Sequence, residues 1–184
     1  GQSAREALKS ATEQHHKEIE EVIQFSAITS LDRYKMLVQK FLAFYAPVED
    51  QVRLGRLDCA LDWERRKKTP ALWVDHQALS LERAPQFDGF RRLESIPQLL
   101  GYLYVAEGST LGGQFLFKQF SRAFNLDENT GARFFYGYGP DTGKKWQSFL
   151  TVLESELQTA EHRQAAAESA KETFVKMAEF FKRS

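Results

Sequence analysis

Nearly every long segment of this 184-residue chain carries apolar residues at the spacing of an α-helix. They recur three or four positions apart, as on one face of a helix with 3.6 residues per turn. The segments with this pattern lie near residues 3–25, 31–47, 71–81, 96–124, 149–160 and 170–181. No strong alternating strand, repeat or linker interrupts them. The sequence therefore predicts an all-α fold in a single domain over residues 1–184.

Local signals set the boundaries of these helices. Thr29 or Ser30, with Asp32, is typical of a helix start, and Pro47 should kink or end the helix that follows. Residues 84–89 and 136–143 are rich in turn-forming residues and are expected to be loops. Residues 125–131 indicate a turn in which Asp127 can cap a short helix.

Three glycines cluster within the apolar helical pattern of residues 96–124, at Gly108, Gly112 and Gly113. A glycine inside a helix costs about 1 kcal/mol relative to alanine. Three within six positions therefore need a compensating gain. The candidates are a kink, a close helix crossing, or a flat ligand that touches the backbone. The ligand interpretation matters most, because a histidine-bearing helix elsewhere in the chain can hold such a ligand from its other side.

Composition excludes several classes of protein. Lys plus Arg and Asp plus Glu both number 25, so the chain lacks the basic excess of a general nucleic-acid binder. No apolar run approaches the roughly 20 residues of a membrane span, and the N-terminus lacks a signal-peptide core. A single cysteine, Cys59, excludes an intrachain disulfide and fits a reducing compartment. We therefore expect a cytoplasmic protein without nucleic-acid or membrane partners.

The adjacent histidines His15 and His16 are the first candidates for chemistry. Helical periodicity places His15 in the middle of the apolar stripe and His16 at its edge, so periodicity alone buries His15. Glu20 lies one turn after His16 and can accept the second N–H of a metal-bound imidazole, whereas Ile19 holds the equivalent position for His15. One packed and one solvated histidine remains the alternative.

Other polar residues carry weaker signals. Glu13-x-x-His16 matches half of a di-iron site, but His76 and His162 lack a glutamate three residues earlier. We expect both of these histidines, and the many helical carboxylates, to be solvated. The glycine-rich stretch before Lys144 and Lys145 lacks the spacing of a phosphate-binding loop. Four basic residues remain as candidates for the edge of an anionic ligand, namely Lys9, Arg133, Lys144 and Lys145.

Two segments together resemble the haem oxygenase family. Residues 11–20, Ala-Thr-Glu-Gln-His-His-Lys-Glu-Ile-Glu, resemble its A-T-x-x-x-H proximal helix, with an acidic residue four positions after the histidine. Residues 104–114 resemble its distal helix in the E-G-S-T-L-G-G form of bacterial members. Residues 133–139 followed by Trp146 are similar to a further stretch of the bacterial biliverdin-forming group. The resemblance spans nearly the whole chain, from about Leu8 to the final helix.

The resemblance implies a helical bundle with haem between the proximal and distal helices. It makes His16 the iron ligand, with Glu20 beside it, and it aligns Lys9 with a lysine that contacts a haem propionate. The loosely matched basic residues are Arg133, Lys144 and Lys145. On the distal side it implies that Gly108 and Gly112, with Gly113, approach the haem face. Ser109 stands in this catalytic stretch where mammalian members have an aspartate that organises distal water, which implies that backbone or other groups hold the water here.

The resemblance also implies a reaction. Haem acts as both cofactor and substrate, and O2 with electrons from a ferredoxin or reductase converts it to biliverdin, CO and ferrous iron. The alternative with the same fold is a non-catalytic haem carrier or sensor. Two others are a haem-independent di-iron oxidase, which the missing second Glu-x-x-His disfavours, and a helical interaction module, which leaves the glycines unexplained.

Overall fold

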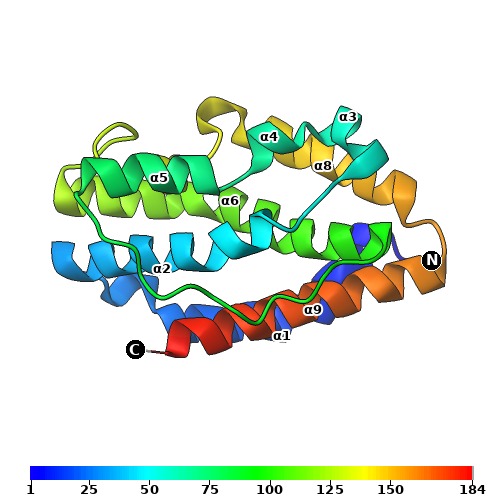
Figure 1. The fold of residues 1–184 in the computed structure, drawn as a ribbon. Coiled ribbons are helices and arrows are strands. Elements are labelled where there is room, and N and C mark those ends of the chain that lie inside the picture. Colours follow the sequence, from blue (N-terminus) through cyan, green and yellow to red (C-terminus); the bar gives the residue numbers. More distant parts are fainter. Residues whose placement is uncertain (184) are drawn as a thin grey trace.

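The computed structural model describes residues 1–183, and every regular element in that range is helical (Figure 1). The long helices are α1 (Ala4–Ile23), α2 (Leu31–Glu49), α6 (Ile96–Phe124), α8 (Thr142–Glu156) and α9 (Ala160–Lys182). The short elements are η1 (Phe25–Ala27), η2 (Gly55–Leu57), α3 (Asp58–Leu61), α4 (Trp63–Arg66), α5 (Thr69–Ala78), α7 (Arg133–Tyr136) and η3 (Gly139–Asp141). The predicted all-α fold is confirmed.

Helix α9 organises the bundle, because it packs along both α1 and α6. Figure 1 shows α1 and α9 side by side along one edge, with α2 and α6 above them. The segment 79–95 has no regular structure; it crosses α2 and then runs along α9 to the start of α6 (Figure 1). Helix α6 therefore packs against α9 and also against α7 and α8, while α5 packs on α2 and α7.

The crossing of α6 and α9 depends on Gly101. A Cβ atom at this position would lie 2.2 Å from the main-chain oxygen of Ala166 and 2.8 Å from Cβ of Ser169. The hydroxyl of Ser169 also donates a hydrogen bond of 2.5 Å to the main-chain oxygen of Gln98. Only a residue without a side chain permits this approach, so close helix packing explains Gly101.

Pro47 lies inside α2 and does not end the helix at that point. The helix continues for two residues to Glu49. Proline has no N–H, so the main-chain oxygen of Ala43 loses its partner within the helix. The N–H of Phe87 donates to that oxygen at 2.9 Å. The 79–95 segment therefore satisfies the carbonyl that Pro47 leaves free.

The C-terminal third contains two further differences from expectation. Residues 142–143 belong to α8 rather than to a loop, and the predicted helix over 149–160 ends at Glu156. A new helix begins because Thr159 caps it, with Oγ1 accepting from the N–H of His162 at 3.1 Å. Asp127 does not cap a helix; it accepts from the N–H of Asn129 within a turn. The short helices over residues 58–66 were not expected, because four-residue helices have little periodicity.

Two glycines of α6 give opposite predictions for stability. Gly101→Ala places a methyl group against Ala166 and should lower the free energy of unfolding by about 1–3 kcal/mol. Gly112→Ala adds a methyl group where no atom lies within 4 Å, and should raise it by up to about 1 kcal/mol. Urea unfolding of the two haem-free variants tests this; equal losses in both would contradict the assignment of Gly101 to helix packing.

Candidate functional site

Two adjoining cavities meet at His16. One has a volume of about 530 Å³ and the other about 490 Å³. Five residues line both cavities, namely His16, Glu20, Gly108, Ser109 and Phe174. The predicted proximal residues of α1 and the predicted distal residues of α6 therefore face a common space.

The two cavities differ in chemistry, and we call them the apolar lobe and the basic lobe. The larger, apolar lobe is lined mainly by aliphatic and aromatic side chains, including Ile19, Ile23, Phe25, Phe41, Leu116, Phe134, Phe135 and Met177. The smaller, basic lobe is lined by three cationic side chains and two glutamates, together with two aromatic rings, namely Arg5, Lys9, Lys17, Glu13, Glu20, Tyr104 and Trp146. A ligand that fills both lobes needs a large apolar body and an anionic edge.

His16 and Glu20 form a pair on α1, one helical turn apart. Nδ1 of His16 lies 3.1 Å from Oε1 of Glu20, and the two side chains are 60% and 57% exposed. In neutral histidine, this contact makes Nδ1 the protonated nitrogen and leaves the lone pair of Nε2 free. The ring of Phe174 contacts the imidazole edge-on, with centroids 5.9 Å apart. The pair can present Nε2 to a metal ion in the cavity.

His15 is the more buried of the two histidines, as periodicity predicts, but it lines neither lobe. Its Nδ1 is buried without a hydrogen-bond partner. Periodicity measures burial against the protein, whereas a ligand-binding side chain must face a space that the protein leaves open. The Glu20 spacing was therefore the better guide to the histidine of the site.

The glycines of α6 have different structural reasons. A Cβ at Gly113 would lie 3.3 Å from the main-chain oxygen of Phe135, so packing against α7 restricts this position. A Cβ at Gly108 would meet only the Trp146 ring, at 3.8 Å, and one at Gly112 would meet nothing within 4 Å. Packing within the protein therefore explains Gly113 but not Gly108 or Gly112. Gly108 and Gly112 instead face the cavity beside His16.

The remaining predicted residues lie at different distances from this site. Lys9 lines the basic lobe, whereas Arg133, Lys144 and Lys145 line neither lobe. Arg133 lines a separate cavity of about 280 Å³ and donates to Oδ1 of Asn129 at 2.7 Å. Nζ of Lys145 lies 5.5 Å from the ring centre of Tyr138, and Lys144 is exposed on α8. Of the four predicted basic residues, the structure therefore places only Lys9 in the cavity beside His16.

Glu107 is a functional candidate that the sequence analysis missed. Its carboxylate is almost fully buried and accepts from Nη1 of Arg66 at 2.8 Å and from Nζ of Lys68 at 2.6 Å. The hydroxyl of Tyr138 donates to the same carboxylate at 2.8 Å. Burial favours a raised pKa for Glu107, but Lys68, Arg66 and the hydrogen bonds outweigh it and lower the pKa. Its position in the apolar stretch before Gly108 was the available signal.

Glu49 and Asp75 are also buried, so the expectation that helical carboxylates are solvated was wrong for these two residues and for Glu107. Glu49 of α2 accepts from the main-chain N–H groups of Lys68 and Thr69 at 2.6 and 2.9 Å, at the start of α5. Asp75 accepts from the N–H groups of Arg133 and Phe134 at 2.7 and 2.9 Å, at the start of α7. These carboxylates satisfy helix N-termini that have no local side-chain cap.

The sequence model of the family described as "Heme oxygenase" matches residues 81–183, which is more than half of the chain. This chain belongs to the haem oxygenase family. It is 36% identical over 90 residues to "Heme oxygenase PigA" of Pseudomonas aeruginosa. That alignment covers 49% of this chain and 45% of PigA, so the matched region spans less than half of that relative.

Solved haem oxygenase structures share the fold over the whole chain. The NO- and CO-bound heme oxygenase from Neisseria meningitidis has a TM-score of 0.83 at 25% identity, covering 100% of this chain and 94% of that one. The heme oxygenase from Leptospira interrogans has a TM-score of 0.74 at 21% identity and covers 100% of both chains. The helical bundle of this chain is therefore the haem oxygenase fold.

Ser109 occupies the centre of the haem oxygenase distal stretch but has its proton engaged. Its hydroxyl donates to the main-chain oxygen of Val105 at 2.8 Å. The hydroxyl of Tyr45 lies near Ser109 and, like that of Tyr102, is buried without a hydrogen-bond partner. Burial raises the pKa of both tyrosines, so both hydroxyls keep their protons. Unpartnered buried hydroxyls are normally satisfied by ordered water.

The other histidines and the cysteine lie outside the site. His162 is exposed, as expected, but His76 is buried, contrary to expectation, with Nδ1 2.9 Å from the main-chain oxygen of Leu72. Burial lowers the pKa of His76, which fits a neutral ring. Cys59 is exposed. Within residues 1–183, no three or more His, Cys, Asp or Glu side chains are grouped so that they could hold a metal ion. No helix in the same range has both the length and the apolar character needed to cross a membrane.

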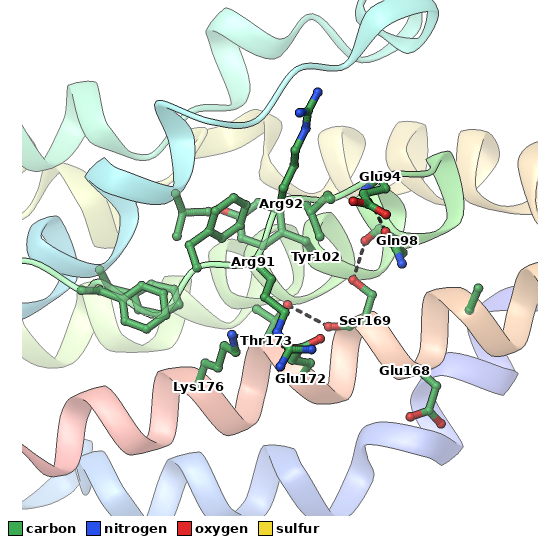
Figure 2. A pocket seen from close by; sticks show the side chains of 16 residues that line it. Arg91, Arg92, Glu94, Gln98, Tyr102, Glu168, Ser169, Glu172, Thr173 and Lys176 are labelled. Atoms are coloured by element: carbon green, nitrogen blue, oxygen red, sulfur yellow. Dashed lines mark hydrogen bonds and ion pairs between the residues drawn. The ribbon is translucent and has the colours of Figure 1, made fainter.

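A further cavity of about 440 Å³ lies between the 79–95 segment, α6 and α9 (Figure 2). Its rim carries charges of both signs, and Glu172 lies 3.7 Å from Arg91 and 3.4 Å from Lys176. No histidine lines it. Among the residues that line it, Glu172 is paired with two cations, and no imidazole is present to bind haem iron. It is therefore distinct from the site at His16.

Asp75 predicts a pH-dependent contribution to stability. Burial raises its pKa from 3.8 to about 6 despite the two hydrogen bonds. Between these pH values the folded protein binds a proton that the unfolded chain has lost, so stability falls as the pH rises towards and through 6. Asp75→Asn should flatten this slope in urea unfolding between pH 4 and 7. The matched control is Asp88→Asn at an exposed position, which should keep the wild-type slope; an unchanged slope in D75N would contradict the assignment.

Proposed function

We propose that this chain is a haem oxygenase that cleaves haem to biliverdin, CO and ferrous iron, using O2 and electrons from a separate ferredoxin or reductase. One observation carries the proposal: the His16–Glu20 pair faces Gly108 and Gly112 across a shared cavity. Membership of the haem oxygenase family supports the same activity.

The cavity has the chemistry that haem requires. Pockets for small molecules and cofactors commonly measure about 300–1,000 Å³, and each lobe lies in that range. The apolar lobe suits the porphyrin ring, and the basic lobe suits the two propionates. We assign the propionates to Lys9, with Arg5 and Lys17 beside it. Arg133, Lys144 and Lys145 receive no role in binding, because they line neither lobe.

His16 is the proposed iron ligand, through Nε2. Its Nδ1–H donates to Glu20, which fixes the tautomer, orients the ring and makes Nε2 a stronger base. Both side chains are largely exposed without a ligand, so binding haem would cover a surface that the protein alone leaves open. Phe174 holds the imidazole from one side and limits its rotation.

Bound haem supplies a redox-active iron and, as substrate, the ring that is opened. The distal residues supply space and shape. Gly108 and Gly112 leave room for a diatomic molecule but present main chain close to one side of it. No side chain of these glycines can act as the acid–base group that favours O–O cleavage in peroxidases. The heme oxygenase from Neisseria meningitidis is described in NO- and CO-bound forms, which supports a place for a diatomic ligand here.

Protons must reach this distal space from groups other than Ser109, whose own proton is engaged with Val105. We propose that ordered water beside the hydroxyl of Tyr45, which lies near Ser109, donates them. The exposed, single Cys59 fits the cytoplasmic location that we propose for the protein.

Product analysis separates this function from a haem carrier or sensor. Hemin titrated into the protein should give a stoichiometric Soret shift. A reductant and O2 should then convert the complex to biliverdin, identified by chromatography, and CO. A carrier or sensor would bind hemin and return it intact, and absence of a Soret shift would remove the proposal altogether.

The adjacent histidines give a matched pair of variants. His16→Ala should abolish haem turnover, because it removes the proposed iron ligand. His15→Ala should mainly lower stability, because His15 is half-buried and lines neither lobe. Glu20→Ala should reduce haem affinity or turnover by about 10–100-fold. Hemin titration and single-turnover assays measure these effects; equal losses in H15A and H16A would show that the ligand is misassigned.

The distal glycines predict a change in chemistry rather than in binding alone. Gly108→Leu or Gly112→Leu fills the space where only the Trp146 ring, or no atom, is near a Cβ. Each variant should lower the biliverdin yield and divert turnover towards peroxidase-type oxidation, measured with a phenolic dye. A wild-type yield of biliverdin in both variants would contradict the role of the bare backbone.

A further inference from the structure

The carboxylate of Glu107 is held away from the cavity that the next residue lines. Gly108 faces both lobes, whereas Glu107 lines neither. Instead, Glu107 binds Arg66 at the end of α4, Lys68 before α5, and Tyr138 before η3. Two chain segments outside α6, residues 66–68 and the turn at Tyr138, therefore converge on the residue that directly precedes the distal glycines.

The two charged partners of Glu107 are buried with it, whereas Tyr138 is partly buried. The side chains of Arg66 and Glu107 are each 2% exposed, and that of Lys68 is 7% exposed. Arg66 also donates through Nε to the main-chain oxygen of Leu61 at 2.6 Å, and the hydroxyl of Tyr138 lies 3.2 Å from Nζ of Lys68. Removing one partner from a buried ion pair is expensive, because the other charge loses its compensation.

The arrangement balances charge beside the distal space. Arg66 and Lys68 bring two positive charges, and Glu107 brings one negative charge. The second negative group is Glu49, which accepts from the main-chain N–H of Lys68. The formal charges of these four residues sum to zero when both carboxylates are ionised. Coulomb interactions are weakly screened in a buried environment, so loss of one member leaves a charge that acts on the distal face.

We propose that Glu107 is a positioning residue for the distal helix, which fixes the Gly108–Gly113 backbone opposite His16 and keeps the buried charge behind it neutral. The inference rests on the proposed function. Gly108, Gly112 and Gly113 have no side chains, and the hydroxyls of Ser109 and Thr110 donate to carbonyls within α6, so none of these groups forms a polar link to another segment. Glu107 provides it from the side of the helix that does not face the cavity.

Opposite charge changes test the electrostatic part. In the ferric haem complex, water on the open side of the iron titrates to hydroxide, and absorption spectra report its pKa. Glu107→Gln leaves an extra positive charge, which stabilises hydroxide and should lower that pKa by roughly 0.5–1 unit, as expected for one charge within about 15 Å at an effective dielectric constant of about 20. Lys68→Met leaves an extra negative charge and should raise the pKa by a similar amount.

A neutral variant controls for structural disturbance. Tyr138→Phe removes a hydrogen bond to Glu107 without changing charge, and should shift the pKa of the ferric water by less than either charge variant. Shifts of the same sign in E107Q and K68M, or no shift in both, would overturn the proposal. Should E107Q fail to fold, K68M compared with Y138F decides alone: an upward shift only in K68M supports the proposal, and equal shifts overturn it.

Amide exchange in the haem-free protein tests the anchoring part. Glu107→Gln should accelerate hydrogen exchange of the amides of residues 108–113 by about tenfold or more relative to the wild type. The control is Glu156→Gln. Glu156 lies on α8, and its carboxylate binds Arg56 at 2.6 Å, so its loss should leave the exchange rates of these amides unchanged. Equal exchange in both variants would overturn the anchoring role. Hemin binding and biliverdin formation by the wild type test the proposed function separately, so the two ideas can fail independently.

Discussion

The arrangement of this molecule depends on one constraint: α6 must come close to neighbouring helices and still leave part of its backbone open. At Gly101 the helix touches the main chain of α9, where any side chain would collide with Ala166. At Gly113 it meets the main chain of α7. Between these contacts, Gly108 and Gly112 face a cavity. The same residue type thus serves packing at two positions and access at two others.

The open stretch of α6 is supported from outside the cavity by buried charges. Glu107 joins α6 to Arg66, Lys68 and Tyr138, and Glu49 joins α2 to the start of α5. Buried ion pairs add little net stability compared with apolar packing, but they specify one geometry. The proximal side has the opposite character, because His16 and Glu20 form a largely exposed pair. A distal stretch backed by buried charges faces a proximal helix whose His16 and Glu20 side chains are accessible.

Much of the fold was predictable from local patterns. Helical periodicity identified α1, α2, α6 and α9, since each carries a long apolar face. The errors occurred where tertiary contacts replaced local signals. Helix α2 continues through Pro47 while Phe87, forty residues away in the chain, takes the free carbonyl of Ala43. Short helices α3 and α4 have too few residues for periodicity to appear.

The sequence by itself determined the helix that carries His16 and Glu20, and the glycines that oppose it, because both depend on spacing within one helix. The tertiary structure decided which candidates meet. It placed Lys9 in the basic lobe and Arg133, Lys144 and Lys145 outside it, and it buried His76, Asp75 and Glu107. Burial of a charged or polar side chain depends on partners distant in the chain. Spacing within a helix cannot reveal such partners, since only folding brings them together.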